Sequence, residues 1–236
     1  MIDIHSHLIP NVDDGAKTPQ ETIELIKEAE KVGITDIILT PHYIINAYEQ
    51  NANTLILLKD KLQQIIDKDN INVKLHIGME VYIINNLIDL LKQNVLLTLA
   101  NSKYLLIELP MNTHVQYLDI IIFKLIENNI IPIIAHPERY KFIQENPDKV
   151  EELIESGCLM QSNIGSILGI YGNHAKQTFK YLLKKDLIHF LGTDTHRKDT
   201  IYPLLKKATK KIEKIIGKEK TEELIKINPQ KILNNT

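Results

Sequence analysis

Short apolar runs alternate with longer amphipathic segments along the whole chain. The runs are rich in Ile, Leu and Val, which is typical of parallel strands with both faces buried, and the segments between them repeat apolar residues at helical spacing. Turn residues mark some boundaries: Thr18 and Pro19 are typical of the start of a helix, and Gly33 of its end. Seven strands are expected, within residues 1–7, 34–40, 73–77, 104–109, 130–135, 158–162 and 187–191.

Helices are expected in the intervening segments. This alternation implies parallel βα units, and a chain of 236 residues has the size of an undivided α/β barrel. No linker or low-complexity stretch divides it, so we predict an α/β fold, a distorted (β/α)7 TIM-like barrel formed as a single domain by residues 1–236. Pro229 is expected to end the last helix. The helices are predicted at residues 18–31, 53–67, 85–92, 115–127, 146–155, 174–185, 202–216 and 219–227.

The composition is ordinary for a globular protein, with 44% hydrophobic and 25% charged residues and a formal net charge of −2. The chain has no long run of charged residues of one sign, and together with the small net charge this argues against nucleic acid or a membrane as the main partner. No apolar run reaches the roughly 18 residues of a membrane span, and the N-terminus lacks the regions of a signal peptide. The single cysteine, Cys158, fits a reducing compartment. We therefore expect a cytoplasmic protein.

Histidine, aspartate and glutamate residues stand at the ends of most apolar runs. The strands of a parallel barrel end at one mouth, where such folds hold their chemistry, so these side chains are expected to converge. His5 and His7 face the same side of a strand and could either hold an ion or line the core. Crowded carboxylates raise their own pKa values, and divalent ions remove that conflict; mixed ligation suits Mn, Zn or Fe rather than Ca. The nine candidate metal ligands are His5, His7, Asp14, His42, Glu80, Glu108, His136, Asp194 and His196.

Only two of the 28 basic residues are arginine, and both stand beside candidate ligands. Arg139 lies three residues after His136, and Arg197 directly follows His196. Arginine binds phosphate or carboxylate with a planar fork of N–H groups that lysine cannot reproduce. Chance in a lysine-rich chain is the alternative, but the placement favours a catalytic, phosphate-binding role for both arginines.

Seven short motifs contain the nine candidate ligands and Arg139. They are His5-Ser-His7, Val12-Asp-Asp-Gly15, Thr40-Pro-His42, Gly78-Met-Glu80, Ile107-Glu108, Ala135-His-Pro-Glu-Arg-Tyr140 and Asp194-Thr-His196. Together they resemble the PHP (polymerase and histidinol phosphatase) superfamily and, within it, the bacterial manganese-dependent protein-tyrosine phosphatases of capsule and exopolysaccharide loci. The resemblance extends to residues 228–233, essentially the whole chain, and its combination of motifs is specific whereas each single motif is weak.

The resemblance implies a cluster of three divalent metal ions, manganese in first place, with iron, zinc or magnesium as alternatives. Asp13 is an alternative to Asp14 as a ligand. Relatives often have asparagine at the position of Arg197 and a second arginine a few residues further on, so Arg139 matches the family more directly. The implied ligands are His5, His7, Glu80 and Asp194 for one ion, Glu80 as a bridge with Glu108 and His136 for the second, and Asp14, His42 and His196 for the third.

The implied activity is hydrolysis of phosphotyrosine by a metal-bound hydroxide, without a covalent enzyme intermediate. The implied substrate is a phosphotyrosine protein, the tail of a bacterial tyrosine kinase that regulates capsule or exopolysaccharide synthesis. Two alternatives stay open: another PHP phosphoesterase, such as a histidinol phosphatase or phosphodiesterase, and a non-catalytic metal-binding module. The sequence does not predict an oligomeric state.

Three further residues bear on the chemistry of the site. Cys158 is expected to be a buried structural thiol, because a cysteine-dependent tyrosine phosphatase needs an arginine six residues later and Ile164 stands there. His114 lies on the loop after Glu108 and could contact the substrate. Asn163 ends the sixth expected strand and could support a ligand.

Overall fold

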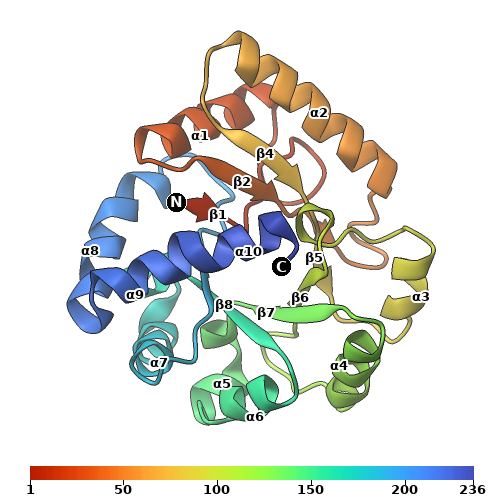
Figure 1. Cartoon of the computed structure of the whole chain (residues 1–236), viewed down its shortest axis with the longest axis vertical. Helices are drawn as coiled ribbons and strands as arrows, with labels where there is room; N and C mark the ends of the chain where they lie inside the picture. Colours follow the sequence, from red (N-terminus) through yellow and green to blue (C-terminus); the bar gives the residue numbers. More distant parts are fainter.

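The computed structural model describes residues 1–236, and all paired strands in it are parallel. One sheet has the strand order β1-β2-β4 and the other the order β3-β5-β6-β7-β8-β9. Helices surround the strands (Figure 1), which is the predicted TIM-like arrangement. The strands are β1 (Ile2–Asp3), β2 (Asp36–Leu39), β3 (His42–Tyr43), β4 (Lys74–Ile77), β5 (Glu80–Tyr82), β6 (Tyr104–Glu108), β7 (Ile131–Ala135), β8 (Leu159–Asn163) and β9 (Phe190–Gly192).

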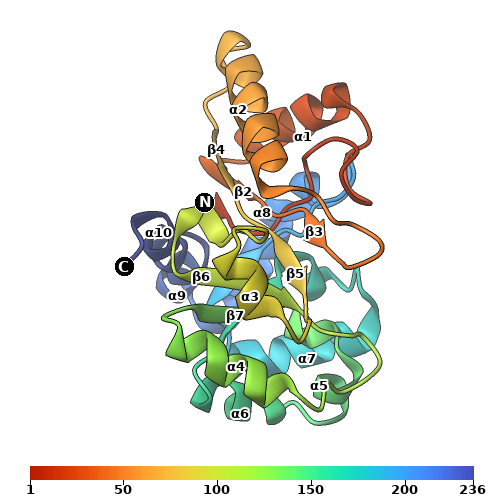
Figure 2. The ribbon, with the colours of Figure 1, turned by 90° about the vertical axis from the view of Figure 1, so that its right-hand side faces the viewer.

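The helices cover the outside of the sheets. Seen from the side, α2 lies against β4 and α4 against β7 (Figure 2). Short 3₁₀ segments connect several elements, among them η2 (Pro137–Arg139) and η3 (Ile164–Leu168). The α-helices are α1 (Pro19–Lys31), α2 (Ala52–Lys68), α3 (Leu87–Lys92), α4 (Leu118–Glu127), α5 (Lys141–Glu145), α6 (Lys149–Glu155), α7 (Gly172–Lys184), α8 (Leu205–Ile216), α9 (Lys218–Glu222) and α10 (Asn228–Asn234).

Each of the seven expected strands has a counterpart, and two further short strands, β3 and β5, lie outside the expected ranges. β3 follows β2 after Pro41, which has no N–H group for a ladder, and β5 follows β4 after Gly78. A side chain at Gly78 would meet Leu99 at 2.8 Å, so only glycine lets the chain pass this close. Backbone hydrogen bonds from Gly78 to Leu39 (2.9 Å) and from Glu80 to Pro41 (3.1 Å) continue the pairing between the two sheets' short strands.

Hydrogen bonds also join the last strand to the first. Asp194 N donates to His5 O at 2.8 Å, and His7 N donates to Thr195 O at 2.9 Å. A parallel bridge pairs Ser6 with Thr195 between them. The chain segments that follow β1 and β9 therefore lie side by side, and the candidate ligands on both meet there.

The C-terminal segment differs from the prediction. Pro229 does not end a helix but lies in the first turn of α10, which follows α9 and the π-helical turn Glu223–Ile227 without a break. The helix expected at residues 146–155 is α6, which begins later, at Lys149. A further short helix, α5, precedes it outside the expected ranges, and Asn146–Asp148, which includes Pro147, separates the two. The helix expected from residue 115 begins at Leu118.

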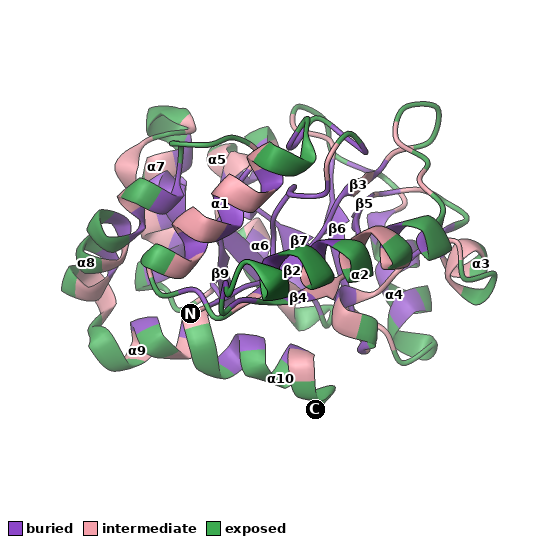
Figure 3. Cartoon of the chain, turned by 90° about the horizontal axis from the view of Figure 1, so that it is seen from above, coloured by how far each residue is buried: buried purple, intermediate pink, exposed green.

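A small apolar cluster fills the space between the strands at one end. It joins Ile2 of β1, Ile38 of β2, Leu106 of β6 and Phe190 of β9 to Ile232 of α10. Helices α9 and α10 cross this end of the strands (Figures 1 and 3), and the buried residues lie on the strands and the inner helix faces. The apolar cluster and these two helices cover the end of the barrel where the strands begin, so the site of chemistry is expected at the opposite end.

No helix combines the length and the apolar character that crossing a bilayer demands.

Candidate metal centre

The nine predicted ligands converge where the strands end. Four overlapping sets of His, Asp and Glu side chains each bring their ligand atoms within 4.8 Å of one another. Two of the residues have left-handed backbone conformations, His136 with φ 33° and Asp194 with φ 54°. Such conformations are uncommon outside glycine, and where the fold imposes them they often mark a functional site. The four sets contain His7, Asp14, His42 and His196; His5, His7 and Glu80; His5, His136 and Asp194; and His42, Glu80 and Glu108.

His5 and His7 are held as a pair whose Nε2 atoms lie 3.2 Å apart. His5 Nδ1 lies 2.7 Å from Gln161 Oε1, and His7 Nδ1 lies 2.8 Å from Asp13 Oδ2. Amide and carboxylate oxygens only accept hydrogen bonds, so both Nδ1 atoms carry protons and donate. Each Nε2 then presents a lone pair unless a proton or a metal ion occupies it.

Two carboxylates face this histidine pair. Glu80 Oε2 lies 3.2 Å from His5 Nε2 and 3.3 Å from His7 Nε2. Asp194 Oδ1 lies 3.5 Å from the first and 3.4 Å from the second. All four side chains are buried, and Glu80 Oε2 has no hydrogen-bond partner. Four electron-pair donors around one buried point are a donor set for a cation, so these residues fit a divalent metal ion.

Glu80 also reaches two further histidines. Its Oε1 lies 3.0 Å from His136 Nε2, and its Oε2 lies 3.0 Å from His42 Nδ1. Glu108 Oε2 lies 3.6 Å from the same His42 nitrogen, and its Oε1 lies 3.9 Å from His136. Glu80 thus lies between several groups of donors, the position expected of a bridging carboxylate.

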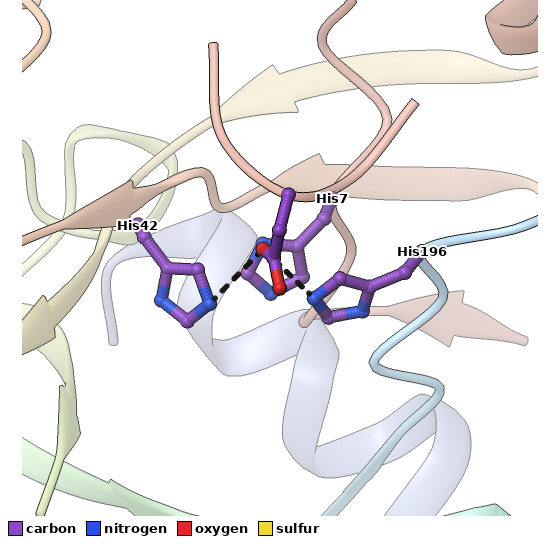
Figure 4. Close-up of side chains that lie close together, drawn as sticks. His7, His42 and His196 are labelled. Atoms are coloured by element: carbon purple, nitrogen blue, oxygen red, sulfur yellow. Dashed lines mark ion pairs between the residues drawn. The ribbon is translucent and has the colours of Figure 1, made fainter. Parts of the chain in front are cut away.

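A third group lies toward the solvent. His7, His42 and His196 surround a carboxylate (Figure 4), and Asp14 Oδ1 lies 3.6 Å from His42 Nε2 and 3.4 Å from His196 Nε2. His196 Nδ1 lies 2.9 Å from the backbone oxygen of Asp194, which leaves its Nε2 facing Asp14. The Asp14 side chain is about half exposed, with 53% of its surface accessible, whereas the donors on His5 are fully buried.

The crowding of charge shifts the pKa values in the direction expected of such a centre. Burial and repulsion from Glu80 raise the pKa of Glu108 to about 8. Burial alone would lower the pKa of His5, but Glu80 and Asp194 outweigh it and raise that pKa to about 9. For Glu80 and Asp194, nearby histidines overcome burial and hold the pKa well below its usual range. The cluster therefore favours positive charge, whether protons or metal ions.

The two arginines are engaged differently. Arg139 Nη1 donates to Asp194 Oδ2 at 3.0 Å, and its guanidinium lies 4.6 Å from the centre of the Tyr171 ring. Arg197 donates to the backbone oxygens of Gly15 and His196. Arg139 thus points toward the centre, while Arg197 ties two loops together. A cavity of about 190 Å³ beside them is lined by Ile170, Tyr171, Asp194, His196, Arg197, Thr200 and Ile201.

Other sequence candidates lie outside the cluster. His114 is exposed and meets the edge of Phe142, with ring centroids 5.3 Å apart. Cys158 is buried, and burial raises the pKa of its thiol to about 12, which fits a structural thiol. Sequence reasoning missed Gln161, the hydrogen-bond partner of His5. Its signal was its place two residues before Asn163 on the same strand, which directs both side chains to one face.

Comparisons with known proteins show which family has a similar sequence. The family model described as capsular polysaccharide synthesis, CpsB/CapC, matches residues 1–234. The tyrosine-protein phosphatase YwqE of Bacillus subtilis strain 168 is 35% identical over 219 residues, which cover 93% of this chain and 86% of YwqE. The tyrosine-protein phosphatase CpsB of Streptococcus agalactiae serotype V is 32% identical over 240 residues, which cover 100% of this chain and 99% of CpsB.

Solved structures agree with these relatives. A structure from work on YwqE of Bacillus subtilis and CpsB of Streptococcus pneumoniae, described as unique metal-dependent tyrosine phosphatases, matches with a TM-score of 0.95 at 34% identity and covers 100% of this chain and 95% of that one. Histidinol phosphate phosphatase of Lactococcus lactis shares the fold, with a TM-score of 0.59 at 17% identity and coverage of 90% of this chain and 93% of that one. The chain belongs to the CpsB/CapC family of capsular polysaccharide synthesis proteins.

Proposed function

We propose that this protein is a metal-dependent protein-tyrosine phosphatase. The observation that carries the proposal is the pair of buried Nε2 atoms of His5 and His7, 3.2 Å apart and faced by Glu80 and Asp194. Membership of a family whose relatives are named tyrosine-protein phosphatases supports the same conclusion. We further propose that residues 1–236 act as a single domain.

The proposed cofactor is a set of three divalent ions, manganese in first place. Such ions, when bound, acidify a water molecule and neutralise the charge that develops on the phosphoryl oxygens. The donor chemistry supports these assignments, with Asp14 rather than Asp13 as a ligand because Asp13 is committed to His7. The proposed holders are His5, His7, Glu80 and Asp194 for one ion, Glu80, Glu108 and His136 for another, and Asp14, His42 and His196 for the third.

Arg139 is the proposed phosphate-binding residue. One of its nitrogens is anchored to Asp194, and the Tyr171 ring supports the guanidinium plane at 4.6 Å. Guanidinium carries five N–H donors, so donors remain for phosphoryl oxygens after Asp194 has been satisfied. The anchored fork would orient the substrate phosphate at the cluster and stabilise its charge. Arg197 is proposed for the same task, with its present contacts to Gly15 and His196 exchanged for phosphate.

The proposed substrate is the phosphotyrosine tail of a bacterial tyrosine kinase that regulates capsule or exopolysaccharide synthesis. Family membership in capsular polysaccharide synthesis supports this partner. The centre is open to solvent at Asp14, so an extended protein segment has access to it.

The test is a substrate panel. Protein loaded with manganese should hydrolyse a phosphotyrosine peptide faster than histidinol phosphate or a phosphodiester, and chelation should abolish turnover until manganese is returned. Glu80→Gln serves as the matched inactive control, because it keeps the shape of the side chain and removes its charge. A preference for histidinol phosphate or the diester, or activity in protein with only trace metal, would overturn the proposal.

A further inference from the structure

Strand β8 is the exception at the metal centre. It reaches the same end of the barrel as its neighbours β7 and β9, but no candidate ligand stands at its end. Instead it carries two fully buried amides, Gln161 and Asn163, on one face of the strand. Burying an amide costs free energy unless its hydrogen bonds are made. The hydrogen-bond partners of Gln161 and Asn163 must therefore compensate for the burial of these two side chains.

The two amides connect two of the candidate ligands. His5 Nδ1 donates to Gln161 Oε1 at 2.7 Å, Gln161 Nε2 donates to Asn163 Oδ1 at 3.0 Å, and Asn163 Nδ2 donates to Asp194 Oδ2 at 2.7 Å. Every hydrogen bond of this series is donated in the same direction, from His5 toward Asp194. A carboxylate only accepts, so Asp194 requires the NH₂ group of Asn163, whose oxygen then requires the NH₂ group of Gln161. The Gln161 oxygen is thereby turned to His5, which fixes the proton on Nδ1 and frees Nε2.

The surrounding fold is shaped for this arrangement. A side chain at Gly192 of β9 would lie 2.9 Å from Gln161 Nε2 and 2.9 Å from His5 Cβ, so glycine leaves the space in which the two residues meet. On the other side, the buried Glu138 accepts a hydrogen bond from the backbone N–H of Asn163 at 2.9 Å. The end of β8 is thus held from both sides.

We propose that Gln161 and Asn163 form a positioning relay that fixes the imidazole of His5 and the carboxylate of Asp194 relative to each other for metal binding. The relay acts through the ligands and touches no substrate. It resembles the general use of outer hydrogen bonds to orient a ligating histidine, but here one continuous chain of amides sets two ligands at once. The inference rests on the proposed metal centre.

The experiment measures binding of manganese by competition with a chelator. Gln161→Leu and Asn163→Leu should each weaken manganese binding roughly 10- to 100-fold. The double variant should lose no more manganese affinity than the more strongly affected single variant, because either substitution alone already breaks the series of hydrogen bonds from His5 to Asp194. Ser162→Ala is the matched control: its buried hydroxyl lies between the two amides on the opposite face and has no hydrogen-bond partner. It should bind manganese like the wild type.

A second readout follows the His5 proton directly. In zinc-loaded protein, the imidazole N–H resonance of His5 should be sharp and protected from exchange in the wild type and in Ser162→Ala. It should be lost or shifted in both Leu variants, with circular dichroism showing that they are folded. Unchanged affinity in the Leu variants, or losses that multiply in the double variant, would overturn the relay. A wild type that binds no metal would instead refute the proposed metal centre.

Discussion

Asp13 accepts a hydrogen bond from His7 Nδ1 at 2.8 Å, which places its carboxylate behind the imidazole and away from the Nε2 that faces the centre. The same carboxylate accepts from the backbone N–H groups of Gly15 at 2.8 Å and His42 at 3.1 Å. Asp14 points the other way, with its Oδ1 between His42 and His196. Adjacent aspartates therefore hold different positions, Asp13 supporting a histidine and Asp14 among the candidate ligand atoms.

This difference predicts distinct phenotypes for two conservative variants. Asp14→Asn removes a charged ligand atom, so elemental analysis after dialysis should find less manganese per chain. Asp13→Asn keeps an acceptor for His7 but weakens it; metal per chain at saturation should stay unchanged, while affinity falls, at most by the roughly 10- to 100-fold typical of residues that support a ligand. Equal metal loss in both variants would contradict the assignment.

Much of this centre could be predicted because its residues follow apolar runs. His5, Glu108 and His136 each stand at or just after a run that forms a strand, and parallel topology brings strand ends together. The choice between Asp13 and Asp14 could not be predicted, since it depends on a loop that turns one carboxylate toward His7.

Other features lay beyond sequence patterns for equally physical reasons. The two unpredicted short strands, β3 and β5, follow Pro41 and Gly78, and the close approach of Leu99 to Gly78 is a long-range contact. The position of Pro229 is ambiguous in the sequence, because proline is compatible both with the end of one helix and with the first turn of the next. Gln161 carries no charge and belongs to no motif, and only the fold reveals that it meets His5.

Glu80 should be the ligand whose loss is most damaging. Its two oxygens lie 3.0–3.3 Å from nitrogens of four histidines, so more than one ion would lose a ligand in Glu80→Gln. We expect kcat/KM on a phosphotyrosine peptide to fall by more than in His136→Ala, with more metal lost per chain. The comparison is made by steady-state kinetics and elemental analysis on the same samples. A smaller loss in Glu80→Gln than in His136→Ala would exclude the bridging position.

Cys158 should be dispensable for catalysis. Burial, aided by the charge of Asp119, raises the pKa of its thiol to about 12, whereas a free thiol has a pKa of about 8.5. A raised pKa keeps the thiol protonated and burial keeps the reagent away, so between pH 7 and 10 the native protein should react with iodoacetamide far more slowly than protein unfolded in urea. Cys158→Ser should keep most of kcat and lose about 1–3 kcal/mol of stability, because the buried hydroxyl lacks a partner. A trapped phosphocysteine would contradict hydrolysis by water.

Arg139→Lys tests the phosphate-binding fork while the charge is kept. Arg139 is anchored to Asp194 at 3.0 Å and lies over Tyr171, so its remaining N–H groups are oriented. Lysine is a point charge, and losing one charge-assisted hydrogen bond to phosphate costs roughly 1.5–3 kcal/mol, or about ten- to a hundredfold in kcat/KM. Manganese per chain should not change, because Asn163 still donates to Asp194.

Arg197→Lys tests whether the second arginine also binds the phosphate. Arg197 donates to the carbonyl oxygens of Gly15 and His196, so its replacement should loosen the loop that carries Asp14. If Arg197 exchanges those carbonyls for phosphate, as proposed, the loss of kcat/KM should be similar to that in Arg139→Lys. If Arg197 only ties the loops together, the kinetic loss should be smaller and a lower melting temperature should be the main effect. Wild-type kinetics in the double variant would show that neither arginine binds the phosphate, and that their placement beside His136 and His196 is coincidence.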